Sequence, residues 1–144
     1  WLLLVSLGVV IAVYDIRHYV IPLQPLVVFF AVTAALGLQG WAALVVPFPF
    51  FILWIISRGA WIGFGDIELM ACAGMLLGLT GGLSAVVLAF WVACIVIIPW
   101  YVMRKIQHRS VNHVIAFGPF ILVGMYSVAI GGINLLTIVQ GMVL

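Results

Sequence analysis

Charged side chains are scarce in this sequence: Lys, Arg, Asp and Glu together make up 6% of its 144 residues. A soluble domain usually has roughly 25% of its residues charged. The sequence is instead 68% hydrophobic, and its long apolar runs are separated by short polar breaks. Such runs are typical of helices that cross a membrane. We therefore expect an integral membrane protein with no separate soluble domain.

Residue patterns that hold metals or redox centres are also missing. The two cysteines, Cys72 and Cys94, lie in apolar runs without CxxC spacing, so we expect neither a metal knuckle nor a redox pair. His108 and His113 lack a third ligand, and no HExxH motif occurs. The sequence therefore predicts no metal and no organic cofactor, and nothing in it suggests nucleic-acid binding.

The apolar runs predict an all-α, polytopic membrane bundle of about six transmembrane helices in a single domain, residues 1–144. The predicted spans are 1–14, 23–38, 42–57, 66–79, 83–103 and 114–130, and residues 133–144 could extend the last one or form a short seventh piece. Pro47 and Pro49 should kink the third span or interrupt its start. A membrane crossing needs roughly 20 residues, so we expect the chain start to be truncated or short.

The basic residues predict which face of the bundle is cytoplasmic. All five lie in the connections after the first, third and fifth spans: Arg17, Arg58, Arg104, Lys105 and Arg109. The connections after the second and fourth spans carry no charge. Lys and Arg favour cytoplasmic loops, so this shared face is expected to be cytoplasmic and the segment 104–113 to contact anionic lipid. A general preference of charged residues for membrane edges would explain why these residues lie near the ends of the spans. It explains less well why the three acids, Asp15, Asp66 and Glu68, lie on the same face.

Two of those acids, Asp15 and Asp66, are candidates for catalysis. Asp15 ends the first predicted span and Asp66 begins the fourth, so both should lie at the cytoplasmic edge. Two carboxyl groups brought close together share a proton, and one then acts as a base on water while the other polarises a peptide carbonyl. The alternative pairs each Asp with an Arg, such as Arg17 or Arg58, as a structural tether. Composition and spacing alone give the two interpretations about equal weight.

Three segments resemble those of one enzyme family in the same order. Gly63 and Gly65 precede Asp66 in the stretch 61–78, WIGFGDIELMACAGMLLG, which resembles the GxGD box of the type IV prepilin peptidases. The stretch 15–25, DIRHYVIPLQP, resembles the family's first catalytic segment, in which Pro follows an Asp seven residues later. The stretch 116–124, AFGPFILVG, resembles the family's Pro-Phe-Gly-Pro segment.

The resemblance implies a membrane aspartic endopeptidase with Asp15 and Asp66 as its catalytic pair. Such an enzyme removes the short basic leader from type IV prepilin-like precursors at the cytoplasmic face of the inner membrane, for pilus or secretion machinery. Residues that would shape the site, for which packing is at least as good an explanation as substrate contact, are Gly63, Gly65, Pro22, Gly118 and Pro119. The compact chain lacks the family's cysteine-containing cytoplasmic insertion, so we expect peptidase activity without methyltransferase activity.

The sequence departs from the family pattern at three positions. Glu68 stands where the family often has Lys, Leu23 follows Pro22 where Asp or Asn is common, and Ala116 replaces a Pro. On a helix Glu68 is about 200° from Asp66 and need not face the pair. Glu68 could meet a basic leader residue or form a salt bridge with Arg58, which we favour. Arg17 is a further candidate for a substrate or salt-bridge contact.

Two other functions fit part of the sequence. Presenilin-like GxGD proteases, which cut within membrane spans, usually place their first Asp in a Tyr-Asp pair, and Tyr14 precedes Asp15 here. The early Ile-Pro pair, the small size and the Phe-Gly-Pro segment favour the prepilin group. A small transporter that relays ions through the two Asp residues would be expected to hold them near mid-span.

Overall fold

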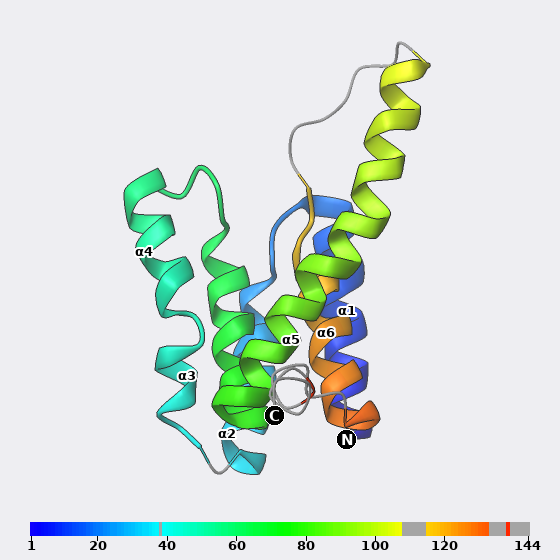
Figure 1. The fold of residues 1–144 in the computed structure, drawn as a ribbon. Helices are drawn as coiled ribbons and strands as arrows, with labels where there is room; N and C mark the ends of the chain where they lie inside the picture. The colour runs from blue at the N-terminus through cyan, green and yellow to red at the C-terminus, as the bar shows by residue number, and fades with distance from the viewer. Residues whose placement is uncertain (38, 108–114, 133–137, 139–144) are drawn as a thin grey trace.

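The computed structural model describes residues 1–37, 39–107, 115–132 and 138, and its regular elements in that part are all helices. They are α1 (Leu2–His18), α2 (Leu23–Leu36), α3 (Ala42–Val45), α4 (Phe48–Ser57), α5 (Phe64–Ile106) and α6 (Gly118–Gly131). Figure 1 shows them packed side by side as an upright bundle. The predicted all-α class is confirmed.

Prolines set two of the helix starts. α3 ends at Val45 and α4 begins at Phe48, because Pro47 and Pro49 are suited to a first helical turn but not to a helix interior. The predicted interruption of the third apolar run is therefore confirmed. α6 begins at Gly118, later than the predicted start at residue 114, with Pro119 in its first turn.

The long helix α5 consists of two helical arms joined at Gly78. Gly78 has φ 74° and ψ −176°, a backbone conformation that is almost restricted to glycine. In Figure 1 the first arm descends from the α4–α5 connection and the second rises at a tilt across the bundle. A Cβ on Gly82 would lie 2.8 Å from the Cα of Gly74, so small residues let the two arms approach closely. The predicted break at 79–82 is therefore a reversal at one residue.

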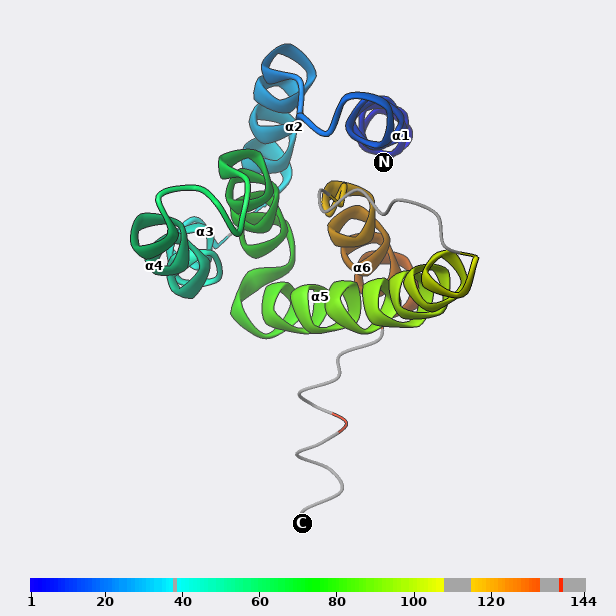
Figure 2. The same ribbon diagram turned by 90° about the horizontal axis from the view of Figure 1, so that it is seen from above.

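α6 lies between α1 and the second arm of α5, as Figures 1 and 2 both show. The hydroxyl of Tyr126 donates a hydrogen bond to the carbonyl oxygen of Leu4 at 2.6 Å, which ties α6 to α1. A Cβ on Gly124 would lie 3.0 Å from the backbone nitrogen of Ala89, so α6 also packs tightly on α5. α2 packs against α1 and α5, and α3 and α4 pack against α5. The position of α1 relative to α5 is therefore fixed through α6 and α2.

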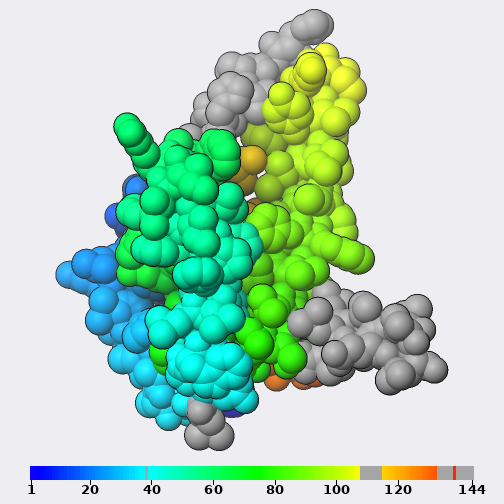
Figure 3. All heavy atoms as spheres, turned by 60° about the vertical axis from the view of Figure 1, so that its left-hand side comes forward, coloured from blue at the N-terminus to red at the C-terminus, as the bar shows by residue number. Residues whose placement is uncertain are grey.

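Many apolar side chains point away from this bundle. α4 has no buried residue, and on the second arm of α5 Trp91 is 63% exposed and Ile95 70% exposed. In Figure 3, α3 and α4 cover one face of the molecule. Among the described residues α5 is the one helix that is long and apolar enough to cross a membrane, and α2, α3 with α4, and α6 are shorter apolar helices.

The ends of helices that carry basic residues lie at one end of the bundle. Arg17 is in the last turn of α1, Arg58 follows α4, and Arg104 and Lys105 are in the last turn of α5. Figure 1 shows these three helix ends at the top, whereas the α2–α3 connection lies at the bottom. The predicted basic segment around Arg109, with His108 and His113, lies outside the described residues, as does the proposed seventh piece except for Ile138.

Candidate active site

Asp15 is a buried carboxylate near the end of α1. It is 4% exposed, and its Oδ2 accepts a hydrogen bond of 3.0 Å from the backbone N–H of Gly118. Gly118 is the first residue of α6, and a helix N-terminus carries a partial positive charge that favours a nearby carboxylate. The start of α6 therefore compensates for part of the cost of burying Asp15.

The contact between these two residues requires glycine at position 118. A Cβ there would lie 2.7 Å from the Asp15 Oδ2, closer than real Cβ atoms come to a heavy atom. Pro119 follows and has no backbone N–H, so within this pair of residues Gly118 alone can donate. This geometry gives a physical reason for the Gly-Pro pair at the start of α6.

Asp66 lies in the first turn of α5 and helps to cap that helix. Gly63 is the N-cap residue and has an extended backbone. Its backbone N–H donates a hydrogen bond to the Asp66 carboxyl. A side chain three residues after the cap that reaches back to it is the acidic half of a capping box. This contact holds the Asp66 carboxyl at the N-terminus of α5, where the residue is partly buried.

Both aspartates line one cavity of about 850 Å³. Asp15 comes from α1 and Asp66 from α5, and the charge of Asp15 acts on the Asp66 carboxyl. Gly63 and Gly65 also line this cavity. The structure thus brings the two predicted catalytic residues together at the end of the bundle where the basic residues lie.

The proposed tether between these aspartates and arginines does not form in the described part of the chain. Asp15 and Asp66 make no salt bridge there, and the side chains of Arg17 and Arg58 are exposed. No Lys, Arg or His lines the cavity in the described residues. The carboxyl groups are therefore held by backbone N–H groups and not by described cationic side chains.

Comparison with known protein families places the chain. Residues 2–99, more than half of its length, match the sequence model of the type IV leader peptidase family. The chain belongs to this family. The match contains Asp15 and the GxGD stretch around Asp66, and it ends before the segment 116–124. No curated protein and no solved structure matches the chain.

Membership of the type IV leader peptidase family identifies the chain as a peptidase, and the predicted resemblance is confirmed at this level. The other predicted site residues occupy distinct positions in the peptidase. Pro22 is the N-cap of α2 and ends the connection after α1, and Gly65 leaves room for Ile21, whose Cβ would be 2.8 Å from a Cβ at position 65. Pro22 and Pro119 do not line the cavity.

Glu68 does not form the salt bridge with Arg58 that the sequence analysis favoured. It forms no salt bridge with Arg58, nor with any other described basic residue, because Arg58 follows the end of α4 with an exposed side chain while Glu68 lines the cavity. The helical angle between Asp66 and Glu68 left open whether Glu68 faces the aspartates. In the structure Glu68 lines the same cavity, which extends along the first turns of α5 as far as Met70.

Several apolar residues of the cavity could not be recognised from the sequence. Phe90 and Ile97 reach it from the second arm of α5, and Ile115 and Phe117 reach it from the segment before α6. Apart from Phe117, which lies in the segment 116–124 that resembles the family pattern, nothing in the sequence distinguishes these residues from other apolar residues in a span. The ring of Phe117 packs against that of Phe90, with ring centroids 4.9 Å apart, so the two segments meet at the cavity wall.

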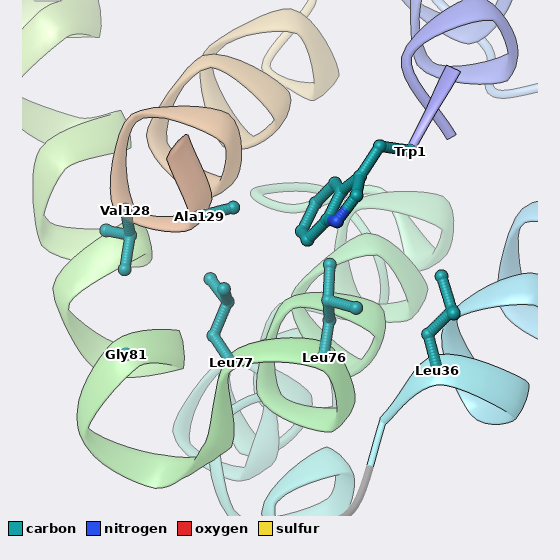
Figure 4. A pocket seen from close by; sticks show the side chains of 7 residues that line it. All are labelled: Trp1, Leu36, Leu76, Leu77, Gly81, Val128 and Ala129. Atoms are coloured by element: carbon teal, nitrogen blue, oxygen red, sulfur yellow. The ribbon is translucent and has the colours of Figure 1, made fainter. Parts of the chain in front are cut away.

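The acidic residues of the cavity are not grouped as a metal site. In the part of the chain that the structure describes, no group of three or more His, Cys, Asp and Glu is arranged to hold a metal ion. A second cavity of about 420 Å³ lies near the start of α1, at the opposite end of that helix from Asp15, and Figure 4 shows the Trp1 ring beside it with Leu36, Leu76, Leu77, Gly81, Val128 and Ala129. None of the described residues that line this second cavity has a titratable side chain.

Proposed function

We propose that this leader peptidase is an aspartic endopeptidase with Asp15 and Asp66 as its catalytic pair. The observation that carries the proposal is that these two carboxyl groups, 51 positions apart in the chain and on different helices, line one cavity that no described Lys, Arg or His lines. Without a cation to neutralise them, two neighbouring carboxyl groups are most stable when they share one proton. That protonation state is the one that peptide hydrolysis by aspartates requires.

The reaction then needs only groups that the cavity supplies, together with water. One aspartate takes a proton from water while the hydroxide adds to the carbonyl carbon, and the other aspartate gives its proton to the carbonyl oxygen. When the tetrahedral intermediate breaks down, the first aspartate protonates the departing nitrogen and the C–N bond breaks. The second aspartate recovers a proton from the intermediate, so both groups return to their starting state.

The substrate we propose is a prepilin-like precursor with a short basic leader followed by an apolar helix. The apolar outer faces of the bundle, such as that formed by Trp91 and Ile95, are suited to contact with lipid and with such a helix. The cleavage site would then lie level with Asp15 and Asp66. The precursor and membrane lipid are the partners that this arrangement implies.

We further propose that the chain is a multi-pass protein of the cytoplasmic membrane with about six spans. Each of the two arms of α5 would form one of the predicted spans, and the reversal of the chain at Gly78 supports this assignment. The basic residues gathered at one end of the bundle would place that end, and the cavity with it, at the cytoplasmic face.

Cleavage of a purified precursor in detergent tests the proposed activity. We expect the wild-type protein to cut at the leader junction, and Asp15→Asn and Asp66→Asn each to lower kcat/KM by about 10²- to 10⁴-fold. Asn keeps an oxygen that can accept the hydrogen bonds from Gly118 and Gly63, so the fold should survive, and thermal unfolding of each variant checks this. An undiminished rate in either folded variant would contradict the catalytic role of that residue.

A further inference from the structure

All three acidic residues of the chain line the same cavity. Asp15, Asp66 and Glu68 are all the Asp and Glu residues of the sequence, and the other described residues that line the cavity are apolar residues, glycines and one tyrosine. No Lys, Arg or His among the described residues lines it. Opposite charges within a cavity with apolar walls attract strongly, because such walls focus the electric field. A positively charged group that entered this cavity would therefore be attracted to its acids.

Glu68 differs from the two aspartates in what holds its carboxyl. Asp15 accepts the N–H of Gly118, and Asp66 is linked to Gly63 at the start of α5. The Glu68 side chain is partly buried, and it makes no salt bridge with a described basic residue. A partly buried carboxylate loses part of its solvation, and no described Lys, Arg or His side chain compensates Glu68 for that loss. A cation from a substrate would restore that interaction.

We propose that Glu68 is a specificity-determining residue that binds a basic side chain, Lys or Arg, of the substrate. The proposal rests on the proposed peptidase function, in which Asp15 and Asp66 are occupied with proton transfer. Because Glu68 follows Asp66 by two positions on the same arm of α5, the basic residue it binds lies close in sequence to the bond that is cut. Glu68 thus selects precursors with a positive charge next to the cleavage site.

The test compares precursors that differ only in leader charge. The basic residues of one leader are replaced in turn by Gln and by Glu, and each precursor is offered to wild type, Glu68→Gln and Glu68→Lys in a detergent without amine head groups. We expect wild type to prefer the basic precursor over the Gln version by roughly three- to tenfold in kcat/KM. Glu68→Gln should bring this ratio close to one, and Glu68→Lys should favour the acidic leader.

A control variant introduces a Glu in place of a Gln outside the cavity. Gln107 lies just beyond the end of α5 and does not line the cavity, so Gln107→Glu should leave the charge preference unchanged. If Glu68→Gln keeps the wild-type ratio of kcat/KM between the basic and Gln precursors, or slows all precursors equally, Glu68 does not recognise the charge of the leader. The proposal is then wrong. Loss of the preference in Glu68→Gln alone supports it.

Binding of a fluorescent leader peptide separates this proposal from the peptidase function. Its anisotropy is measured with wild type and with Glu68→Gln at low and moderate salt, since a charge contact weakens as salt rises. Glu68-dependent binding without cleavage supports the binding role and contradicts the proposed enzyme. Equal cleavage rates for precursors of different leader charge contradict only the role of Glu68. Neither cleavage nor Glu68-dependent binding contradicts both.

Discussion

The backbone N–H of Gly118 donates a hydrogen bond to the Oδ2 of Asp15 at 3.0 Å, across 103 positions of the chain. This bond joins the end of α1 to the first residue of α6. It places a buried carboxylate at the positive end of a helix dipole, where its charged form is stabilised. The proposed catalytic geometry therefore depends on how closely these two helices approach.

Gly118→Ala should impair activity through this contact. The added Cβ would lie 2.7 Å from the Asp15 Oδ2, so the carboxylate or the start of α6 must move. Losing a hydrogen bond to a charged group predicts a drop in kcat/KM of about 10- to 100-fold. A precursor cleavage assay measures it. Gly40→Ala is the matched control, because a Cβ there meets nothing within 4 Å, and equal rates for the two variants would contradict the account.

Gly78→Ala should destabilise the fold. Gly78 has φ 74° and ψ −176°, which an alanine adopts only with strain, and its Cβ would also press on the side chain of Gln39. We expect the free energy of unfolding to fall by about 1–3 kcal/mol. Thermal unfolding in detergent measures the change as a lower Tm.

Gly132→Ala is the control for that loss, because it places an alanine at another glycine of positive φ. Gly132 also has a positive φ, of 61°, but a Cβ there meets nothing within 4 Å. Its ψ of 18° belongs to the left-handed helical region, which other residues visit at lower cost than the region of Gly78. The Tm of Gly132→Ala should therefore fall less than that of Gly78→Ala, and an equal or larger fall would argue against a special role for the reversal.

Much of the helical order could be predicted from apolar runs and prolines. A run of apolar residues forms a helix in a membrane because its backbone groups must bond to one another, and Pro47 interrupts such a run because it has no N–H to give. The meeting of Asp15 and Asp66 at one end was expected from the alternation of the predicted spans, which puts the charged connections on one side. These features depend on local chemistry that each segment carries by itself.

The remainder depends on contacts between segments that are distant in the sequence. The glycines at 78, 81 and 82 made several positions equally suitable for a turn, and the contact with Gln39 that distinguishes Gly78 could not be foreseen. The place of Glu68 on the cavity could not be derived from its helical angle to Asp66, because that angle describes one helix whereas the cavity is formed by several. Phe90 reached the site through the tilt of the second arm of α5, which no sequence pattern specifies.

Asp15 and Asp66 are proposed to act as one catalytic unit, and a double-mutant comparison tests this most directly. The cleavage rate is measured for wild type, Asp15→Asn, Asp66→Asn and the double variant, with thermal unfolding to show that each is folded. Residues that share one proton in one reaction fail together, so the double variant should be no slower than the slower single variant. If the two losses multiply in the double variant, the aspartates act independently and the paired mechanism is wrong.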